Sequence, residues 1–341
     1  MKSKELIRRI IRHDAPERIG YCFLGDNPSD IMMVPGVKLL YSYDKKYSEW
    51  GREEYLTRQV PDFSGEVRMS PEGNIFGRFE GKTSGECIKG ALQDSWDLLQ
   101  TYTFPELDIE GYKTRIATYD CANSDRYLLS HLPFAVFSPL RDMRHMENAL
   151  MDILIEPENV CALLDKTTDI AVASIPYIAA TGANGAIIYD DLGMQHAPFL
   201  SPAAFREILK PYYKKLADAL HSHGMDFFVH SCGKITDFIP DFIDAGVDVF
   251  QFDQPELHGV EALASKFGDK ATFFCPVDIQ KIMPTGDRKV IENGTLKMVN
   301  AFKKCGGGLI VKDYFSWNDI NVLPEWQQWA RDVVIKNAYI K

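Results

Sequence analysis

Short hydrophobic runs recur through the second half of the chain, and a helix-length stretch follows each of them. We predict strands at these runs: Gly185–Tyr189, Phe227–Val229, Val247–Phe252, Ala271–Phe274 and Leu309–Lys312. Most of these runs are apolar throughout rather than alternating with polar residues. Such runs are typical of parallel strands that are buried on both faces.

Helix signals fill the stretches between these strands. We predict helices at Glu158–Thr181, Ser201–His221, Lys234–Ala245, Val260–Phe267, Asn293–Lys304 and Pro324–Lys336. Ser201-Pro202 supplies a cap and a first-turn proline for the helix that begins there. Gly246 ends the helix Lys234–Ala245. Strands that alternate with helices predict a parallel sheet. At 341 residues, the most favoured closed form is a (β/α)8 TIM barrel, which belongs to the α/β class.

The first half of the chain is less regular. Leu6, Ile7, Ile10 and Ile11 form one apolar stripe, so we expect a helix within residues 1–17 that docks on the body of the domain. Strands are predicted at Arg18–Leu24 and Arg115–Tyr119, and a helix at Ala149–Leu154.

Residues 41–103 break the strand–helix alternation. They are rich in glycine, aromatic and charged residues, with short hairpin strands around Val67 and Ile75–Phe79 and a helix at Gln93–Thr103. We expect this segment to be an insertion that covers the C-terminal mouth of the barrel. The whole chain, 1–341, is then a single domain.

Composition narrows the function. The formal net charge is −10, which argues against nucleic acid or an anionic membrane as a main partner. The seven cysteines show no spacing typical of a disulfide framework, and no apolar run reaches membrane-spanning length. Together with a start that lacks a signal-type apolar core, this predicts reduced thiols and a cytoplasmic location. A homodimer is compatible with the sequence.

One stretch suggests chemistry. His230-Ser231-Cys232-Gly233 ends the strand at Phe227–Val229. Side chains two apart on a strand share a face, so His230 and Cys232 can point into one cavity. The carboxyl ends of parallel strands are where α/β folds build their sites. An imidazole and a thiolate there predict half of a zinc site. The alternative is a buried thiol that only fills space.

Other polar and aromatic residues follow the strands as well. Asp190-Asp191 and Asp253-Gln254-Pro255-Glu256 come directly after two of them, and Lys312 ends a third. Because neighbours alternate in direction, only one of Asp190 and Asp191 should enter the cavity. Tyr189 and Trp317 are candidates for an aromatic pocket, and ordinary core packing is the alternative.

The order of these motifs resembles that of the uroporphyrinogen decarboxylase superfamily. The resemblance rests on four segments and covers most of the chain: Gln93–Pro105, Tyr189-Asp190-Asp191-Leu192-Gly193-Met194-Gln195, Phe199–Tyr212 and His230-Ser231-Cys232-Gly233. Within the superfamily, the chain looks most like the cobalamin-linked methyltransferases. The resemblance implies a (β/α)8 barrel and a zinc ion bound by the His-x-Cys pair and by a third cysteine near the end of the seventh strand.

That third cysteine is absent here, because the corresponding region is Leu309–Phe315. We expect Cys275 to replace it, since Cys275 follows the strand Ala271–Phe274 and should reach the same mouth. Four carboxylates can complete the coordination: Asp190, Asp191, Glu256 and Asp313.

The resemblance implies methyl transfer between a small substrate (a methyl ether, thiol or amine) and a methylcobalamin-type corrinoid on a separate protein. Nothing in the chain resembles a cobalamin-binding domain. We assign Asp191 and Glu256 as candidate acids or bases. The candidate substrate-binding residues are Tyr189, Asp190, Gln195, Asp253, Lys312 and Trp317.

Two alternatives remain. The first is uroporphyrinogen decarboxylation, but the family's decarboxylases carry arginines after the first strand, and Tyr21–Asn27 has none. The second is a barrel that binds a small molecule without catalysis.

Overall fold

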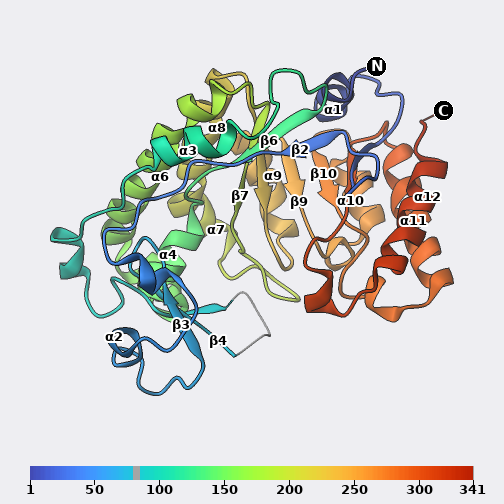
Figure 1. The fold of residues 1–341 in the computed structure, drawn as a ribbon. Coiled ribbons are helices and arrows are strands. Elements are labelled where there is room, and N and C mark those ends of the chain that lie inside the picture. Colours follow the sequence, from blue (N-terminus) through green and yellow to red (C-terminus); the bar gives the residue numbers. More distant parts are fainter. Residues whose placement is uncertain (80–84, 341) are drawn as a thin grey trace.

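The computed structural model of the chain describes residues 1–79 and 85–340. Its centre is a parallel eight-stranded sheet that curves into a nearly closed barrel (Figure 1). The strands are β1 (Gly20–Cys22), β2 (Ile31–Met33), β6 (Tyr127–His131), β7 (Gly185–Tyr189), β8 (Asp226–His230), β9 (Val249–Gln251), β10 (Thr272–Cys275) and β11 (Leu309–Lys312). The predicted (β/α)8 fold is confirmed.

The strand order is β1-β11-β10-β9-β8-β7-β6-β2, and all seven pairings are parallel. The two edge strands, β1 and β2, lie next to each other in sequence and in space. Asp30 donates its backbone N–H to the carbonyl of Tyr21 at 2.8 Å. This contact brings the edges together, so that the sheet encloses an interior.

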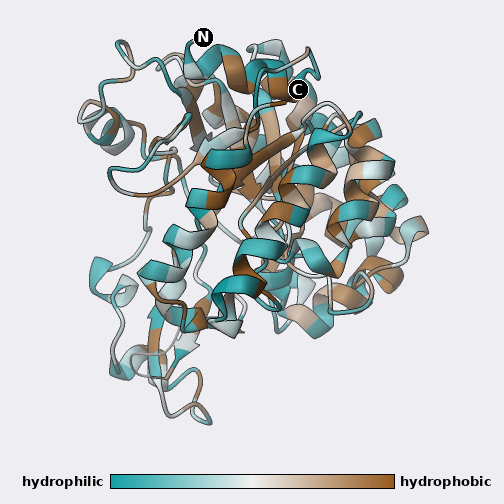
Figure 2. Ribbon diagram, turned by 90° about the vertical axis from the view of Figure 1, so that its right-hand side faces the viewer, coloured by the Kyte–Doolittle hydropathy of each residue, from teal (hydrophilic) through white to brown (hydrophobic). Residues whose placement is uncertain are grey.

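Helices surround the barrel. They are α3 (Ile109–Ile116), α4 (Phe137–Arg144), α5 (Met146–Ile155), α6 (Pro157–Ala179), α7 (Pro202–Ala204), α8 (Lys210–Ser222), α9 (Ile239–Ala245), α10 (Val260–Phe267), α11 (Arg288–Lys303) and α12 (Pro324–Asn337). In Figure 2 the central strands are hydrophobic, whereas the helices also carry hydrophilic segments. None of the helices in the described ranges combines the length and hydropathy that a bilayer-spanning helix needs.

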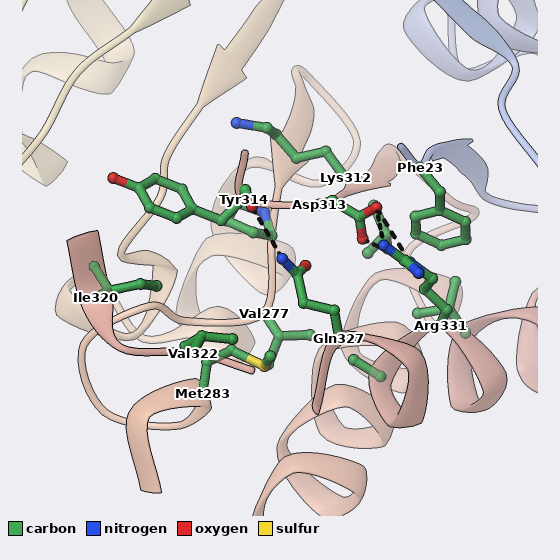
Figure 3. Close-up of a pocket in the computed structure, with 14 residues that line it drawn as sticks. Phe23, Val277, Met283, Lys312, Asp313, Tyr314, Ile320, Val322, Gln327 and Arg331 are labelled. Carbon is green, nitrogen blue, oxygen red and sulfur yellow. Dashed lines mark hydrogen bonds and ion pairs between the residues drawn. The ribbon is translucent and has the colours of Figure 1, made fainter. Parts of the chain in front are cut away.

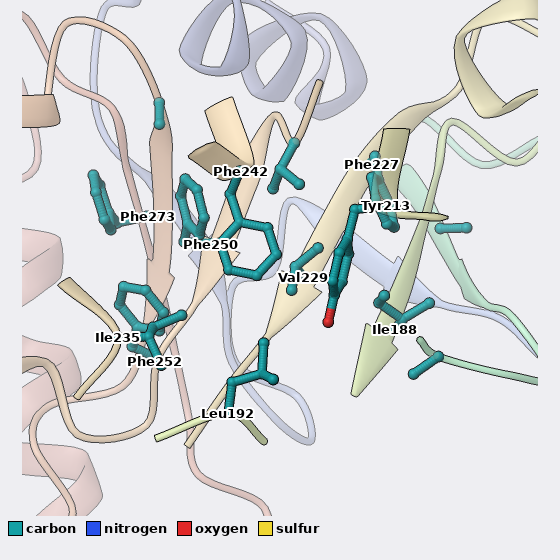
Figure 4. Packing of buried hydrophobic residues seen from close by; sticks show 14 of the residues in the cluster. Ile188, Leu192, Tyr213, Phe227, Val229, Ile235, Phe242, Phe250, Phe252 and Phe273 are labelled. Atoms are coloured by element: carbon teal, nitrogen blue, oxygen red, sulfur yellow. The ribbon is translucent and has the colours of Figure 1, made fainter. Parts of the chain in front are cut away.

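Alternation along each strand separates two hydrophobic clusters. Phe227, Val229, Phe250 and Phe273 point outward and pack against the helix layer (Figure 4). Phe228 and its counterparts on other strands point inward, into a smaller cluster: Ile31, Tyr127, Leu129, Ile187, Val249, Phe274 and Ile310. The inward positions fix which side chains reach the mouth.

Helix α1 (Ser3–Ile11) closes the barrel at its N-terminal end. All four residues of the predicted stripe, Leu6, Ile7, Ile10 and Ile11, are buried in the inner cluster. At Gly20 a Cβ atom would lie 2.8 Å from Ile7 Cδ1, so glycine permits this close approach. The opposite, carboxyl end is left for the site.

The segment 41–103 forms a cap beside the mouth. Its described residues include helix α2 (Glu54–Thr57) and an antiparallel sheet of β3 (Glu66–Met69), β4 (Ile75–Arg78) and β5 (Glu86–Lys89). The cap docks on α4: Cys87 Sγ lies 3.2 Å from the carbonyl of Asp142, and Leu92 donates its N–H to Met143 at 2.8 Å. Figure 1 shows the cap next to α4, remote from α1.

Two predicted elements differ from the structure. Arg115–Tyr119 is not a strand, because helix α3 extends to Ile116 and a turn follows. Asp108 caps this helix by accepting the N–H of Gly111 at 2.9 Å, which favours the helix over an isolated strand. The predicted helix Gln93–Thr103 shortens to a 3-10 turn at Trp96–Gln100, capped by Ser95.

Candidate metal site at the carboxyl end of the barrel

His230 and Cys232 lie together at the mouth, as predicted. His230 is the last residue of β8 and points inward, since it is two residues after Phe228. Its Nε2 lies 3.4 Å from Cys232 Sγ. The turn after them depends on Gly233, whose φ is +74° and whose added Cβ would lie 2.1 Å from the carbonyl oxygen of Gly193. The β7 and β8 loops can therefore touch here.

Asp191 completes a cluster of three donors. Its Oδ1 lies 3.2 Å from His230 Nε2 and accepts the backbone N–H of Cys232 at 2.8 Å. One donor atom from each of Asp191, His230 and Cys232 lies within 4.8 Å of the others. Burial raises the pKa of Asp191, but hydrogen bonds from His230 and the Cys232 N–H lower it below its usual value overall. The carboxylate is therefore ionised.

A second layer of polar residues holds the imidazole. Gln251 Oε1 contacts His230 Nδ1, and Gln251 Nε2 donates to Asp253 Oδ1 at 2.7 Å. Lys312 Nζ lies 3.2 Å from the same Asp253 oxygen. This series of contacts places a proton on His230 Nδ1 and directs His230 Nε2 toward Asp191 and Cys232. Metal-bound histidines usually show the same arrangement.

The geometry fits a tetrahedral cation. Zinc ligands at about 2.0–2.3 Å and tetrahedral angles stand roughly 3.3–3.5 Å apart. The N–O and S–N distances here are 3.2 and 3.4 Å. Burial lowers the pKa of His230, yet Asp191, Cys232 and the charge of Asp253 raise it to about 10. Thus the surroundings favour positive charge at Nε2, whether a proton or a metal carries it.

The prediction that Cys275 joins this cluster is wrong in its geometry. Strand β10 runs to Cys275, and Phe274 is its inward residue. Cys275 therefore points outward into the cluster beneath the helices, where it is 2% exposed. Burial raises the pKa of its thiol to about 12. In the described structure the third donor beside His230 and Cys232 is Asp191, one of the four carboxylates predicted to complete the coordination.

Asp190 points away from the mouth and caps a helix instead. Its carboxylate accepts the N–H groups of Val136, Phe137 and Ser138 at 2.6–3.0 Å and contacts the hydroxyl of Tyr213. These N–H groups lie at the start of α4. Only Asp191 of the acidic pair enters the cavity, as the alternation predicted, and the structure does not bring Asp190 to the predicted substrate site.

Other predicted carboxylates are also engaged elsewhere. Glu256, a predicted acid or base, forms an ion pair with Lys297 of α11 at 3.2 Å. Asp313, an alternative ligand, binds Arg331 at 2.7 Å and accepts the N–H of Leu24 at 2.7 Å. Neither carboxylate joins the donor cluster of Asp191, His230 and Cys232.

The predicted substrate-binding residues divide into two groups. Tyr189, Asp253 and Lys312 are at the mouth, and the Tyr189 ring centroid is 5.4 Å from that of His230. Gln195 is exposed on the β7 loop, and Trp317 packs against the outer hydrophobic cluster. The structure does not place these last two in the cluster around His230.

The cap contributes to the rim beside Tyr189. A cavity of about 200 Å³ lies between Tyr189, the start of α4 and the cap residues Glu72 and Asn74. The nearby guanidinium of Arg141 pairs with Asp142 at 2.9 Å. Arg141 and Lys312, two of the cations near the mouth, are thus each paired with a carboxylate.

Sequence reasoning missed Gln251 and Tyr314. Gln251 is two residues before Asp253, on the inward face of β9, so alternation alone could have found it. Tyr314 is two residues after the inward Lys312, and Figure 3 shows Lys312 directed away from the Asp313–Arg331 pair. Burial raises the pKa of Tyr314 most, and the charges of Asp253, Cys232, Asp319 and Asp191 add to bring it to about 12.

A parallel barrel with a polar cluster at the carboxyl ends of its strands defines the class of enzyme-type TIM barrels. The family model for uroporphyrinogen decarboxylase (URO-D) matches residues 130–312, more than half of the chain. The chain therefore belongs to the uroporphyrinogen decarboxylase family. The search of curated proteins gave no match.

Two solved structures are similar to this chain to different degrees. A methyltransferase from Methanosarcina mazei is 12% identical with a TM-score of 0.61, and the match covers 98% of this chain and 99% of that one. A chitinase from Chromobacterium violaceum is 10% identical with a TM-score of 0.36, covering 89% and 98% of the two chains. At these identities the first match supports the barrel fold over nearly the whole chain.

Proposed function

We propose that this chain is a zinc-dependent methyltransferase. It would move a methyl group between a small methylated substrate and the cobalt of a corrinoid carried by a separate protein. The observation that carries the proposal is the convergence of Asp191 Oδ1, His230 Nε2 and Cys232 Sγ at the mouth. The similarity in fold to a protein named as a methyltransferase supports the choice of reaction.

The residues present fit zinc better than a harder cation. A mixed oxygen, nitrogen and sulfur set is common for zinc, and a thiolate disfavours magnesium or calcium. His230, Cys232 and Asp191 would hold the ion. When bound with an open position, zinc supplies Lewis acidity that polarises the substrate heteroatom.

The chain's own residues then prepare the site. Gln251 and Asp253 fix the His230 ring, and Lys312 balances the charge of Asp253. Asp191 has one oxygen engaged by His230 and the Cys232 N–H, whereas Oδ2 makes no hydrogen bond within residues 1–79 and 85–340. This second oxygen is free to take a proton from a thiol or to contact the ion.

Decarboxylation of uroporphyrinogen fits the mouth less well. That substrate carries several carboxylates and calls for unpaired cations. Arg141 and Lys312 each have a carboxylate partner, at 2.9 and 3.2 Å. The loop after β1, Gly25–Pro28, supplies no basic side chain.

A methyl-transfer assay tests the proposal. Zinc-loaded protein is mixed with free methylcobalamin and a panel of thiols and phenols, and loss of the methyl–cobalt bond is followed by visible absorbance. We expect turnover with at least one acceptor in the wild type and a loss of roughly 100-fold or more in Cys232→Ala. Cys121→Ala, on the turn after α3, is the control and should keep full activity.

Uroporphyrinogen is included in the same assay as a competing substrate. Its conversion to coproporphyrinogen by the wild type, without methyl transfer to any acceptor, would contradict the proposal.

A further inference from the structure

We propose that Tyr314 is a further catalytic residue whose hydroxyl donates a hydrogen bond to the substrate heteroatom that gains or loses the methyl group. The inference rests on the proposed methyl transfer and deepens it. It adds a donor from just beyond β11, the strand that lies opposite β7 in the strand order of the barrel. It also narrows the class of substrate.

The position of Tyr314 follows from strand β11. Lys312 faces the interior, Asp313 faces outward to Arg331, and Tyr314 returns to the inner side (Figure 3). The backbone holds it there, because the Tyr314 carbonyl accepts from Gln327 Nε2 of α12 at 3.0 Å. Its ring stacks on that of Phe315 with centroids 5.8 Å apart.

The surroundings of the hydroxyl identify what it faces. Asp253, Cys232, Asp319 and Asp191 all act electrostatically on it, and three of these four groups belong to the mouth. Across the cluster, the Tyr189 ring lies against His230, with centroids 5.4 Å apart. The three-donor cluster is thus flanked by two tyrosines, one from the end of β7 and one from beyond β11.

The Tyr314 hydroxyl is an unused donor. It makes no hydrogen bond to any residue in the described ranges, although its backbone carbonyl does. The other groups near the cluster are committed: Lys312 binds Asp253, and ionised carboxylates only accept hydrogen bonds. A phenol stays protonated at neutral pH, so it can donate without adding charge.

The chemistry gives this donor a role. When a methyl group leaves a substrate R–X–CH₃, the C–X bond breaks and X keeps the electron pair. The methyl carbon bonds to the cobalt(I) of the corrinoid partner, which supplies the two electrons of the new bond. X thereby becomes an anionic oxygen or sulfur, and a positioned hydrogen bond stabilises the charge as it develops. In the reverse direction the same bond orients the attacking thiolate.

A preference for the substrate follows. Ethers and thioethers leave an anion that a phenol can stabilise. A methylated ammonium leaves a neutral amine and gains less from a donor. The geometry therefore points to a methyl ether or thioether in place of a quaternary amine.

The test compares Tyr314→Phe with the wild type, using 2-mercaptoethanol as the probe thiol and free methylcobalamin as the methyl donor. Binding is measured on the Co²⁺-substituted proteins from the visible absorption of the thiolate complex. We expect about a tenfold weaker Kd for the thiol, as for one hydrogen bond to a charged group. We expect kcat/KM for the thiol to fall by up to about tenfold with little loss in kcat, because the hydrogen bond is strongest to the bound thiolate and weakens as its sulfur is methylated.

Metal content separates this role from a structural one. Tyr314→Phe keeps the ring and its stacking, so zinc per chain should match the wild type. Tyr339→Phe is the matched control, because Tyr339 forms a backbone β-bridge with Arg18 near the N-terminal end of the barrel. This variant should have the wild-type Kd, activity and zinc content.

Wild-type values in Tyr314→Phe for both the Kd of the thiol and its kcat/KM would overturn the inference and leave the methyltransferase proposal standing. Loss of zinc from this variant would also overturn it, since the residue would then hold the metal site together. No metal and no transfer in the wild type would overturn the proposed function and this inference with it.

Discussion

Gln251 links the candidate ligands to the rest of the mouth. It contacts His230 Nδ1 with its oxygen and gives its amide N–H to Asp253, which in turn binds Lys312. A leucine of similar size would leave His230 Nδ1 and Asp253 short of a partner inside the barrel. The imidazole would then lose both its fixed orientation and its preferred tautomer.

We therefore expect Gln251→Leu to bind zinc about 10- to 100-fold more weakly than the wild type while remaining folded. Affinity is measured by competition with a coloured chelator. Gln328→Leu changes a half-buried glutamine on α12, outside the donor cluster, and serves as the control. Equal zinc affinities in Gln251→Leu and the wild type would show that this second layer does not tune the site.

The residues of the site could be predicted only where the sequence shows which side chains of a strand point into the barrel. His230 and Cys232 were found because a polar pair two residues apart ends an apolar run. Cys275 was misplaced because Thr272-Phe273-Phe274-Cys275 is buried on both faces, so hydrophobicity does not show which residues point inward. Asp191 was predicted only as one of four possible carboxylate ligands. The conformation of the loops after the strands decides which carboxylate points toward His230, and the sequence does not show it.

Helices and strands with a clear hydrophobic pattern were also predicted well, and short strands were not. Gly185–Tyr189, Val260–Phe267 and Leu309–Lys312 match their predicted bounds. Strands β2 and β6 were missed, and β2 is only three residues long. So short a strand has no periodicity of its own and forms because it pairs with β6.

An ion pair joins helix α8 to two strands. His221 Nε2 lies 2.8 Å from Asp248 Oδ2, and Asp248 also accepts the N–H of Phe227 at 2.7 Å. The hydrogen bond that His221 donates to Asp248 is the main cause that raises the pKa of His221. The charges of Asp226 and Asp218 add to this increase, whereas burial opposes it. A raised pKa in the folded state means that folding favours the protonated imidazole.

The stabilisation should therefore be complete below the unfolded pKa of about 6.5 and disappear as the pH rises through the folded value. His221→Gln should lower the free energy of unfolding by up to about 1 kcal/mol at pH 5.5, a small value because the pair is partly exposed. The loss should be smaller at pH 9, where the imidazole is less often protonated. Urea unfolding at the two pH values measures this. A larger loss at pH 9 would contradict the assigned ion pair.

The whole molecule leaves one end of the barrel available for chemistry. Helix α1 fills the N-terminal end with four buried aliphatic residues, and the cap borders the other end along α4. The barrel class was predictable because the βα alternation is long and strongly patterned. The cap's docking was not, since it depends on contacts between segments far apart in sequence, such as Cys87 with Asp142.

The most direct test of the account is the zinc content of three purified proteins after zinc loading and desalting: the wild type, Cys232→Ala and Cys275→Ala. Mass spectrometry of the metal per chain gives the answer without knowledge of the substrate. We predict about one zinc per chain in the wild type and in Cys275→Ala, and little or none in Cys232→Ala. A wild type that retains no zinc, or a Cys275→Ala variant that remains folded and loses it, would contradict the site built from Asp191, His230 and Cys232.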